Sequence, residues 1–68
     1  MDSMLEFCKS VLSKVSFDRT LFAKELKKSV RWLKRSEIQS LKDWCLNRYG
    51  EVYGDLILNT FSNQALLV

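Results

Sequence analysis

The 68-residue sequence contains no histidine and no proline, and it has only two glycines and two cysteines. Histidine is the commonest general base, proton shuttle and metal ligand, so its absence removes the most frequent forms of enzyme and metal chemistry. The eight acidic residues are spread along the chain without the spacing of a metal loop or a clustered carboxylate site. We therefore expect no enzymatic activity, no metal, no cofactor and no small-molecule substrate.

The two cysteines, Cys8 and Cys45, lie far apart and do not form the CxxC pattern of a zinc or redox site. Each falls on the apolar face of a predicted helix, where a thiol behaves as a small hydrophobic group. The sequence shows no signal-peptide pattern, and its longest apolar run, residues 65–68, is far shorter than the roughly 20 residues that span a bilayer. These features predict a soluble, cytoplasmic protein with reduced, buried thiols and no membrane span.

The two glycines stand at positions 50 and 54, so the chain before them lacks the strongest helix breakers. Apolar residues recur there at the i, i+3, i+4 spacing of amphipathic helices. We expect Gly50 to end a helix as a C′ glycine. The pattern predicts an all-α fold, a small bundle of three helices over residues 3–15, 18–34 and 37–49 with a short fourth helix over residues 55–62.

Polar residues mark where these helices are expected to begin. Ser3 and Ser36 each open a capping-box pattern, with a glutamate or glutamine three residues later. Either Ser16 or Asp18 is expected to cap the second helix, because both side chains accept hydrogen bonds from free backbone amides. Phe17, which lies between them, is expected to be buried.

A chain of 68 residues has room for one small core, since folding removes only roughly 60% of the exposed surface at this size. With 47% hydrophobic residues, the chain is too apolar to be disordered. We expect a single domain over residues 1–68, in which residues 62–68 form either a docked or a frayed tail. Because small cores contribute only about 3 to 5 kcal/mol, self-association as a dimer is an open alternative.

The net charge of +3 is unevenly distributed, because residues 18–35 hold seven lysine and arginine side chains against two carboxylates. Six of the seven fall within about 120° of the circumference of the predicted second helix, beside its apolar face. This basic stripe is either a docking surface or the solvated back of the helix. Its members are Lys24, Lys27, Lys28, Arg31, Lys34 and Arg35.

Trp32 lies on the same predicted helix but away from its apolar face, close to Leu21 on the helical wheel. In one interpretation, the first helix or the C-terminal tail folds over this tryptophan. In the other, Trp32 forms a binding hot spot with Arg31 and Lys28, since tryptophan and arginine are enriched in hot spots. Trp44, by contrast, lies on the apolar face of the third helix and is expected in the core.

Two classes of partner remain for the basic stripe. The first is a protein partner, or a second copy of the chain, which would make this a small protein-binding or regulatory module. The alternative is non-specific binding of a nucleic-acid backbone, which is less favoured because the helix placed to read bases, residues 37–49, has no net charge. Membrane-surface binding is disfavoured, since the core requires the apolar face of the second helix. The residues expected to bind the partner are Lys24, Lys27, Lys28, Arg31, Trp32, Lys34 and Arg35.

Overall fold

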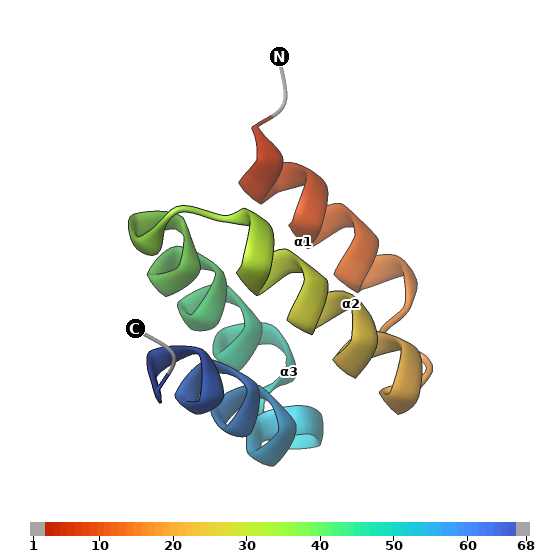
Figure 1. Cartoon of the computed structure of the whole chain (residues 1–68). Helices are drawn as coiled ribbons and strands as arrows, with labels where there is room; N and C mark the ends of the chain where they lie inside the picture. The colour runs from red at the N-terminus through yellow and green to blue at the C-terminus, as the bar shows by residue number, and fades with distance from the viewer. Residues whose placement is uncertain (1–2, 67–68) are drawn as a thin grey trace.

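The structure, a computed structural model, describes the backbone of residues 3–66 and the side chains of residues 3–62. It contains three helices, α1 (Met4–Lys14), α2 (Arg19–Trp32) and α3 (Arg35–Leu66), and no strand within that range. Helices α1 and α2 form an antiparallel hairpin, and α3 bends so that its second half runs back alongside its first half (Figure 1). The start of this second half meets α2 through the pair of Asp55 with Arg19. The predicted all-α bundle is confirmed, whereas a separate fourth helix over residues 55–62 is not shown, because these residues continue α3 beyond a kink at Tyr53.

The predicted end of a helix at Gly50 is wrong, because α3 continues through both glycines to Leu66. A C′ glycine needs a positive φ, and none of the described residues has one. The backbone departs from helical geometry at Tyr53 instead, with a φ of −121° and a ψ of 21°. Residues 62–66 of the expected tail continue α3, whereas residues 67–68 lie outside the described part of the chain.

The first two helix starts follow the sequence signals. The Ser3 hydroxyl accepts a hydrogen bond from the Glu6 amide at 3.1 Å, as expected for an N-cap. Of the two candidates for α2, Asp18 is the cap, because its carboxylate accepts from the amides of Thr20 and Leu21 at 2.9 and 3.1 Å. The Ser16 hydroxyl instead donates back to a carbonyl of the preceding turn.

The start of α3 differs from the prediction, because the helix begins at Arg35 and Ser36 is not its cap. The Glu37 carboxylate reaches back and accepts a hydrogen bond from the Lys34 amide at 3.0 Å. In a capping box, the side chain three residues into the helix accepts a hydrogen bond from the backbone amide of the capping residue. Glu37 and Lys34 make this bond two residues before the predicted pair of Gln39 and Ser36. A glutamate in the first turn also suits the positive end of the helix dipole.

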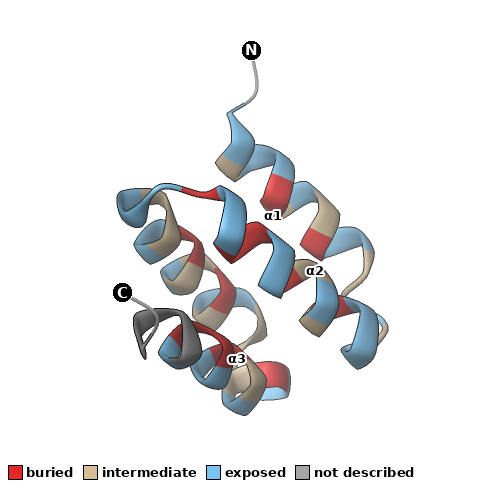
Figure 2. Cartoon of the chain, viewed as in Figure 1, coloured by how far each residue is buried: buried red, intermediate tan, exposed pale blue. Residues whose placement is uncertain are grey.

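The core lies between the facing sides of the helices, where the buried positions gather (Figure 2). Both cysteines are buried and free, as predicted. Burial raises the pKa of the Cys45 thiol to about 12, although the nearby Lys9 ammonium acts in the opposite direction. The buried apolar residues are Cys8, Leu12, Phe22, Leu26, Val30, Leu33, Leu41, Cys45, Tyr53, Ile57 and Phe61.

Two apolar residues close to the turns of the chain, Phe17 and Val52, are exposed. Phe17 is 80% exposed, so the prediction that it is buried is wrong. The turn between α1 and α2 directs Val15 to the core and uses the Ser16 carbonyl to bind α3, which leaves Phe17 outside. Val52 is 68% exposed because the bend at Tyr53 interrupts the helical repeat immediately after it.

A row of aromatic rings connects α2 to the bend of α3 and to the turns before it. The Tyr53 ring stacks on Phe22 at 4.8 Å between centroids, and Phe22 makes an edge contact with Tyr49 at 5.2 Å. Tyr49 in turn meets the ring of Trp44 edge-on at 5.7 Å. Trp44 is half-buried and packs against the core, with the cations of Lys9 and Arg48 over its ring.

The Tyr53 hydroxyl donates a hydrogen bond to the Ser16 carbonyl at 2.6 Å. This bond ties the bend of α3 to the turn between α1 and α2. We expect Tyr53→Phe, which keeps the stacked ring and removes the donor, to lower the free energy of unfolding by about 1 kcal/mol in urea titrations. Tyr49→Phe is the control, because its hydroxyl makes a longer, exposed contact of 3.4 Å with Ser13 and should matter less. Equal losses in the two variants would contradict a special role for the Tyr53 bond.

The continuity of α3 through its glycines makes a second prediction. A Cβ atom added at Gly54 would meet nothing within 4 Å, and one at Gly50 would only touch the Leu46 side chain at 4.0 Å. Because helical glycine is less favourable than alanine, Gly50→Ala and Gly54→Ala should each raise the free energy of unfolding by about 0.5–1 kcal/mol. A loss of stability in Gly50→Ala would instead indicate a left-handed C′ position.

Candidate binding groove

The side of α2 that carries the basic stripe faces outward because the opposite side forms the core. Phe22, Leu26 and Val30 of α2 are buried. Since these residues share one face of the helix, the residues between them are directed towards solvent. Within α2, the basic side chains are therefore exposed, and they are Lys24, Lys27, Lys28 and Arg31.

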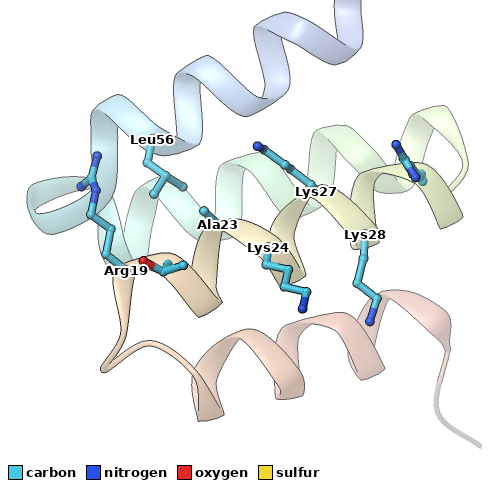
Figure 3. Close-up of a pocket in the computed structure, with 8 residues that line it drawn as sticks. Arg19, Ala23, Lys24, Lys27, Lys28 and Leu56 are labelled. Carbon is cyan, nitrogen blue, oxygen red and sulfur yellow. The ribbon is translucent and has the colours of Figure 1, made fainter.

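The second half of α3 begins beside this exposed side, and together they form a groove of about 560 Å³. Ala23 from α2 and Leu56 from α3 point towards one another across it and form an apolar floor (Figure 3). Lys27 extends to the side of α2 on which α3 lies, whereas Lys24 and Lys28 extend towards α1 (Figure 3). The residues that line the groove are Arg19, Thr20, Ala23, Lys24, Lys27, Lys28, Arg31 and Leu56.

Five cations line this groove, and two of them have carboxylate partners. Arg19 pairs with Asp55 of α3 at 2.9 Å, and Lys28 lies 3.8 Å from Glu25 on the preceding turn. Within the described part of the chain, Lys24, Lys27 and Arg31 form no ion pair. The groove therefore has an excess of positive charge that a negatively charged partner would neutralise.

The ion pair between Arg19 and Asp55 closes one end of the groove. The Arg19 guanidinium donates to the Asp55 carboxylate and also lies 6.0 Å from the centroid of the Tyr53 ring. Hydrogen bonds from Arg19 and from the Leu56 amide hold the pKa of the Asp55 carboxyl below its ordinary value. The bend of α3, through Tyr53 and Asp55, thus holds Arg19 in position.

The residues predicted to bind a partner are only partly brought together. Four of the seven line the groove, namely Lys24, Lys27, Lys28 and Arg31. Trp32, Lys34 and Arg35 are exposed but do not line it. Helix α2 ends at Trp32, so Lys34 and Arg35 no longer follow its helical repeat, and the predicted continuous stripe is interrupted.

Trp32 is 60% exposed, so α1 does not fold over it, and the alternative that the tail covers it concerns side chains outside the described residues. In the helical repeat of α2, Trp32 shares a side with Leu21 and Lys28, nearly opposite Ala23. It therefore borders the basic surface on the side of α1 and not on the side of the groove floor. Its role as a hot spot stays a prediction.

Four residues of the groove were not predicted from the sequence, namely Arg19, Thr20, Ala23 and Leu56. Arg19 carried a usable signal, because it precedes Ala23, Lys27 and Arg31 at steps of four along one side of the helix. Thr20 and Leu56 carried none. Leu56 joins the groove only because α3 bends, and the sequence predicts an interruption near residues 50–54 but not the direction in which the chain turns.

No cluster of three or more histidine, cysteine, aspartate or glutamate side chains that could hold a metal ion occurs among the described residues. None of the helices in that part of the chain is long and apolar enough to cross a membrane. Comparison with models of known protein families, with curated proteins and with solved structures finds no match. The geometry and charge of the groove are therefore the features that bear on function.

The pair at the end of the groove can be tested by titration. In carboxyl ¹³C NMR, Asp55 should remain ionised to a lower pH than an unpaired aspartate, because its charged form accepts the Arg19 hydrogen bond. Arg19→Gln removes the positive charge and the guanidinium, so the pKa of Asp55 should rise towards its ordinary value. An unchanged titration curve in Arg19→Gln would show that the pair does not persist in solution.

Proposed function

We propose that this protein acts by binding rather than by catalysis, and that it docks an acidic segment of another protein in the groove between α2 and the second half of α3. One observation carries this proposal: the same groove combines an apolar floor with three cations that have no ion-pair partner in the described chain. These cations are Lys24, Lys27 and Arg31. Neither feature alone would favour a protein partner.

The cations favour an acidic partner but supply little affinity by themselves. Exposed ion pairs contribute about 0–1 kcal/mol each, and salt screens them over about 8 to 10 Å. Complementary charge mainly steers encounter and excludes wrong partners. The half-buried floor at Ala23 and Leu56 adds an apolar contact from which a docked side chain would exclude water.

The composition of the groove favours protein over nucleic acid. Single-stranded nucleic acids bind where bases stack on aromatic side chains, and none of the residues that line this groove is aromatic. A phosphate backbone needs many cation contacts for appreciable affinity at physiological salt, about 6 to 10 in strong binders. Nucleic acid is therefore kept as an outcome of the test.

Trp32 extends the proposed surface beyond the groove. It follows Lys28 by four residues, so the two side chains are neighbours on the exposed side of α2. A partner that reached across Lys28 towards α1 would also contact this tryptophan, which is the residue type most enriched in hot spots. We therefore keep Trp32 in the proposed surface as a flanking contact.

The experiment is a capture from nuclease-treated native lysate with the wild type and two charge-reversed variants. Lys27→Glu/Arg31→Glu changes the groove, and Lys14→Glu/Lys34→Glu makes the same change of net charge at exposed positions that do not line it. We expect protein partners that bind the wild type and the control but are lost from the groove variant. Each such partner is then purified, and its affinity for the three proteins is measured by calorimetry.

The proposal is overturned if both variants retain the same proteins as the wild type, or if a parallel capture without nuclease yields only nucleic acid. Multi-angle light scattering of the wild type and both variants measures whether each protein is a monomer or a dimer, which tests a second outcome against the proposal. If the groove variant converts a dimer into a monomer, the groove binds a second copy of the chain and not another protein. Circular dichroism melting curves must show that each variant is folded.

A further inference from the structure

We infer that the occupant of the groove is an amphipathic α-helix that lies along α2, with one apolar stripe on the floor and carboxylates on the side of that stripe that faces the exposed side of α2. This inference rests on the proposed function and names the kind of partner. It is carried by the arrangement of the groove residues on α2 and α3.

The structure disfavours two other common modes of peptide recognition at this groove. An extended peptide binds by adding a strand to a sheet edge, and residues 3–66 contain no strand. A proline-rich peptide needs grooves lined with aromatic rings, which this lining lacks. Here both walls are helices whose backbone groups are already hydrogen bonded, so an occupant must satisfy its own backbone. An α-helix does so within itself.

The cations repeat at a helical interval. Lys24 and Lys28 are four residues apart and extend towards α1 (Figure 3). Lys27 lies nearer to the floor, and Arg31 follows it by four residues in the helical repeat. Four residues of helix rise about 6 Å, and carboxylates at positions i and i+4 of a second helix have the same spacing. Because both rows lie on the same side of Ala23 around α2, acidic pairs on one side of an apolar stripe would match them.

The extent of the groove sets the length of the occupant. Its lining on α2 runs from Arg19 to Arg31, a rise of about 18 Å along the helix axis. A docked helix of about 12 to 14 residues would cover that length. The apolar stripe would meet the floor near one end, because Ala23 and Leu56 lie closer to Arg19 than to Arg31 along the groove.

The ion pair at that end shows the contact that the occupant would repeat. The Asp55 carboxylate accepts from the Arg19 guanidinium at 2.9 Å, so one cation of the groove is already neutralised by the chain itself. A carboxylate of the occupant must compete with Asp55 for Arg19. Removal of the Asp55 charge should therefore strengthen binding, whereas removal of any other groove charge should weaken it.

The probe is a fluorescein-labelled synthetic peptide of about 14 residues, with leucines at helical i, i+4, i+7 positions and glutamates at i and i+4 along one side of the leucines. Three further probes accompany it: a scrambled peptide of the same composition, polyglutamate of equal charge, and a single-stranded oligonucleotide. Fluorescence anisotropy gives each affinity for the wild-type chain. Circular dichroism reports whether the bound peptide is helical.

We expect the amphipathic peptide to bind at least about tenfold more tightly than the scrambled peptide or polyglutamate, and to gain helicity. The groove variant Lys27→Glu/Arg31→Glu should weaken the affinity for the amphipathic peptide by about tenfold or more. The matched control Lys14→Glu/Lys34→Glu should weaken that affinity by less than about threefold. Asp55→Asn should bind it more tightly than the wild type. Ala23→Gln, which places a polar side chain on the floor and leaves every charge in place, should weaken the amphipathic peptide but not polyglutamate.

The failures of the two proposals are distinguishable. Equal affinity for the amphipathic, scrambled and polyglutamate probes overturns the helical occupant, while the docking of acidic proteins stands. Tighter binding of the oligonucleotide than of every peptide overturns both proposals. If Ala23→Gln affects the binding of all acidic probes equally, Ala23 does not form an apolar floor for the occupant. If Asp55→Asn weakens binding of the amphipathic peptide, Asp55 does not compete with the occupant for Arg19.

Discussion

The hydrogen bond from the Tyr53 hydroxyl to the Ser16 carbonyl joins the bend of α3 to the turn between α1 and α2. The same tyrosine stacks on Phe22, so the one residue with non-helical geometry inside α3 is also one of its most firmly held. The bend places the start of the second half of α3 against α2. Without it, Leu56 and Asp55 would lie away from Arg19 and Ala23, and the basic side of α2 would be an open helix surface and not the wall of a groove.

The charge of the groove is a consequence of how the core is built. A core of this size needs the apolar face of α2, with Phe22, Leu26 and Val30 buried against the other helices. The basic residues are therefore held on a rigid helix that cannot turn them inward. Rigid placement matters for recognition, because a partner then loses less entropy in matching fixed charges than in ordering mobile ones.

The parts of this structure that local patterns determine were predictable from the sequence, and the parts that depend on packing were not. The apolar repeats predicted three helical regions, and the Asp18 cap and the cluster of Lys24, Lys27, Lys28 and Arg31 followed from positions within one helix. The sequence predicted an interruption between residues 49 and 55, and α3 bends within that segment, at Tyr53. The exact position of the bend was not predictable, because Tyr53 is no helix breaker and α3 stays helical through Gly50. Leu56 enters the groove only through that bend, and Lys34 leaves it only because α2 ends at Trp32.

The groove lies over a seam in the molecule. Its two walls, α2 and the second half of α3, are distant in sequence and meet through Tyr53, Ile57 and the exposed pair of Arg19 with Asp55. Contacts that close long loops form late and open readily in small helical proteins, because they lack the support of near neighbours in the chain. A ligand that spans both walls would act as a clamp on this seam. Occupancy and folding are therefore coupled: the filled groove suppresses the opening of α3, and the melting temperature becomes a measure of ligand concentration.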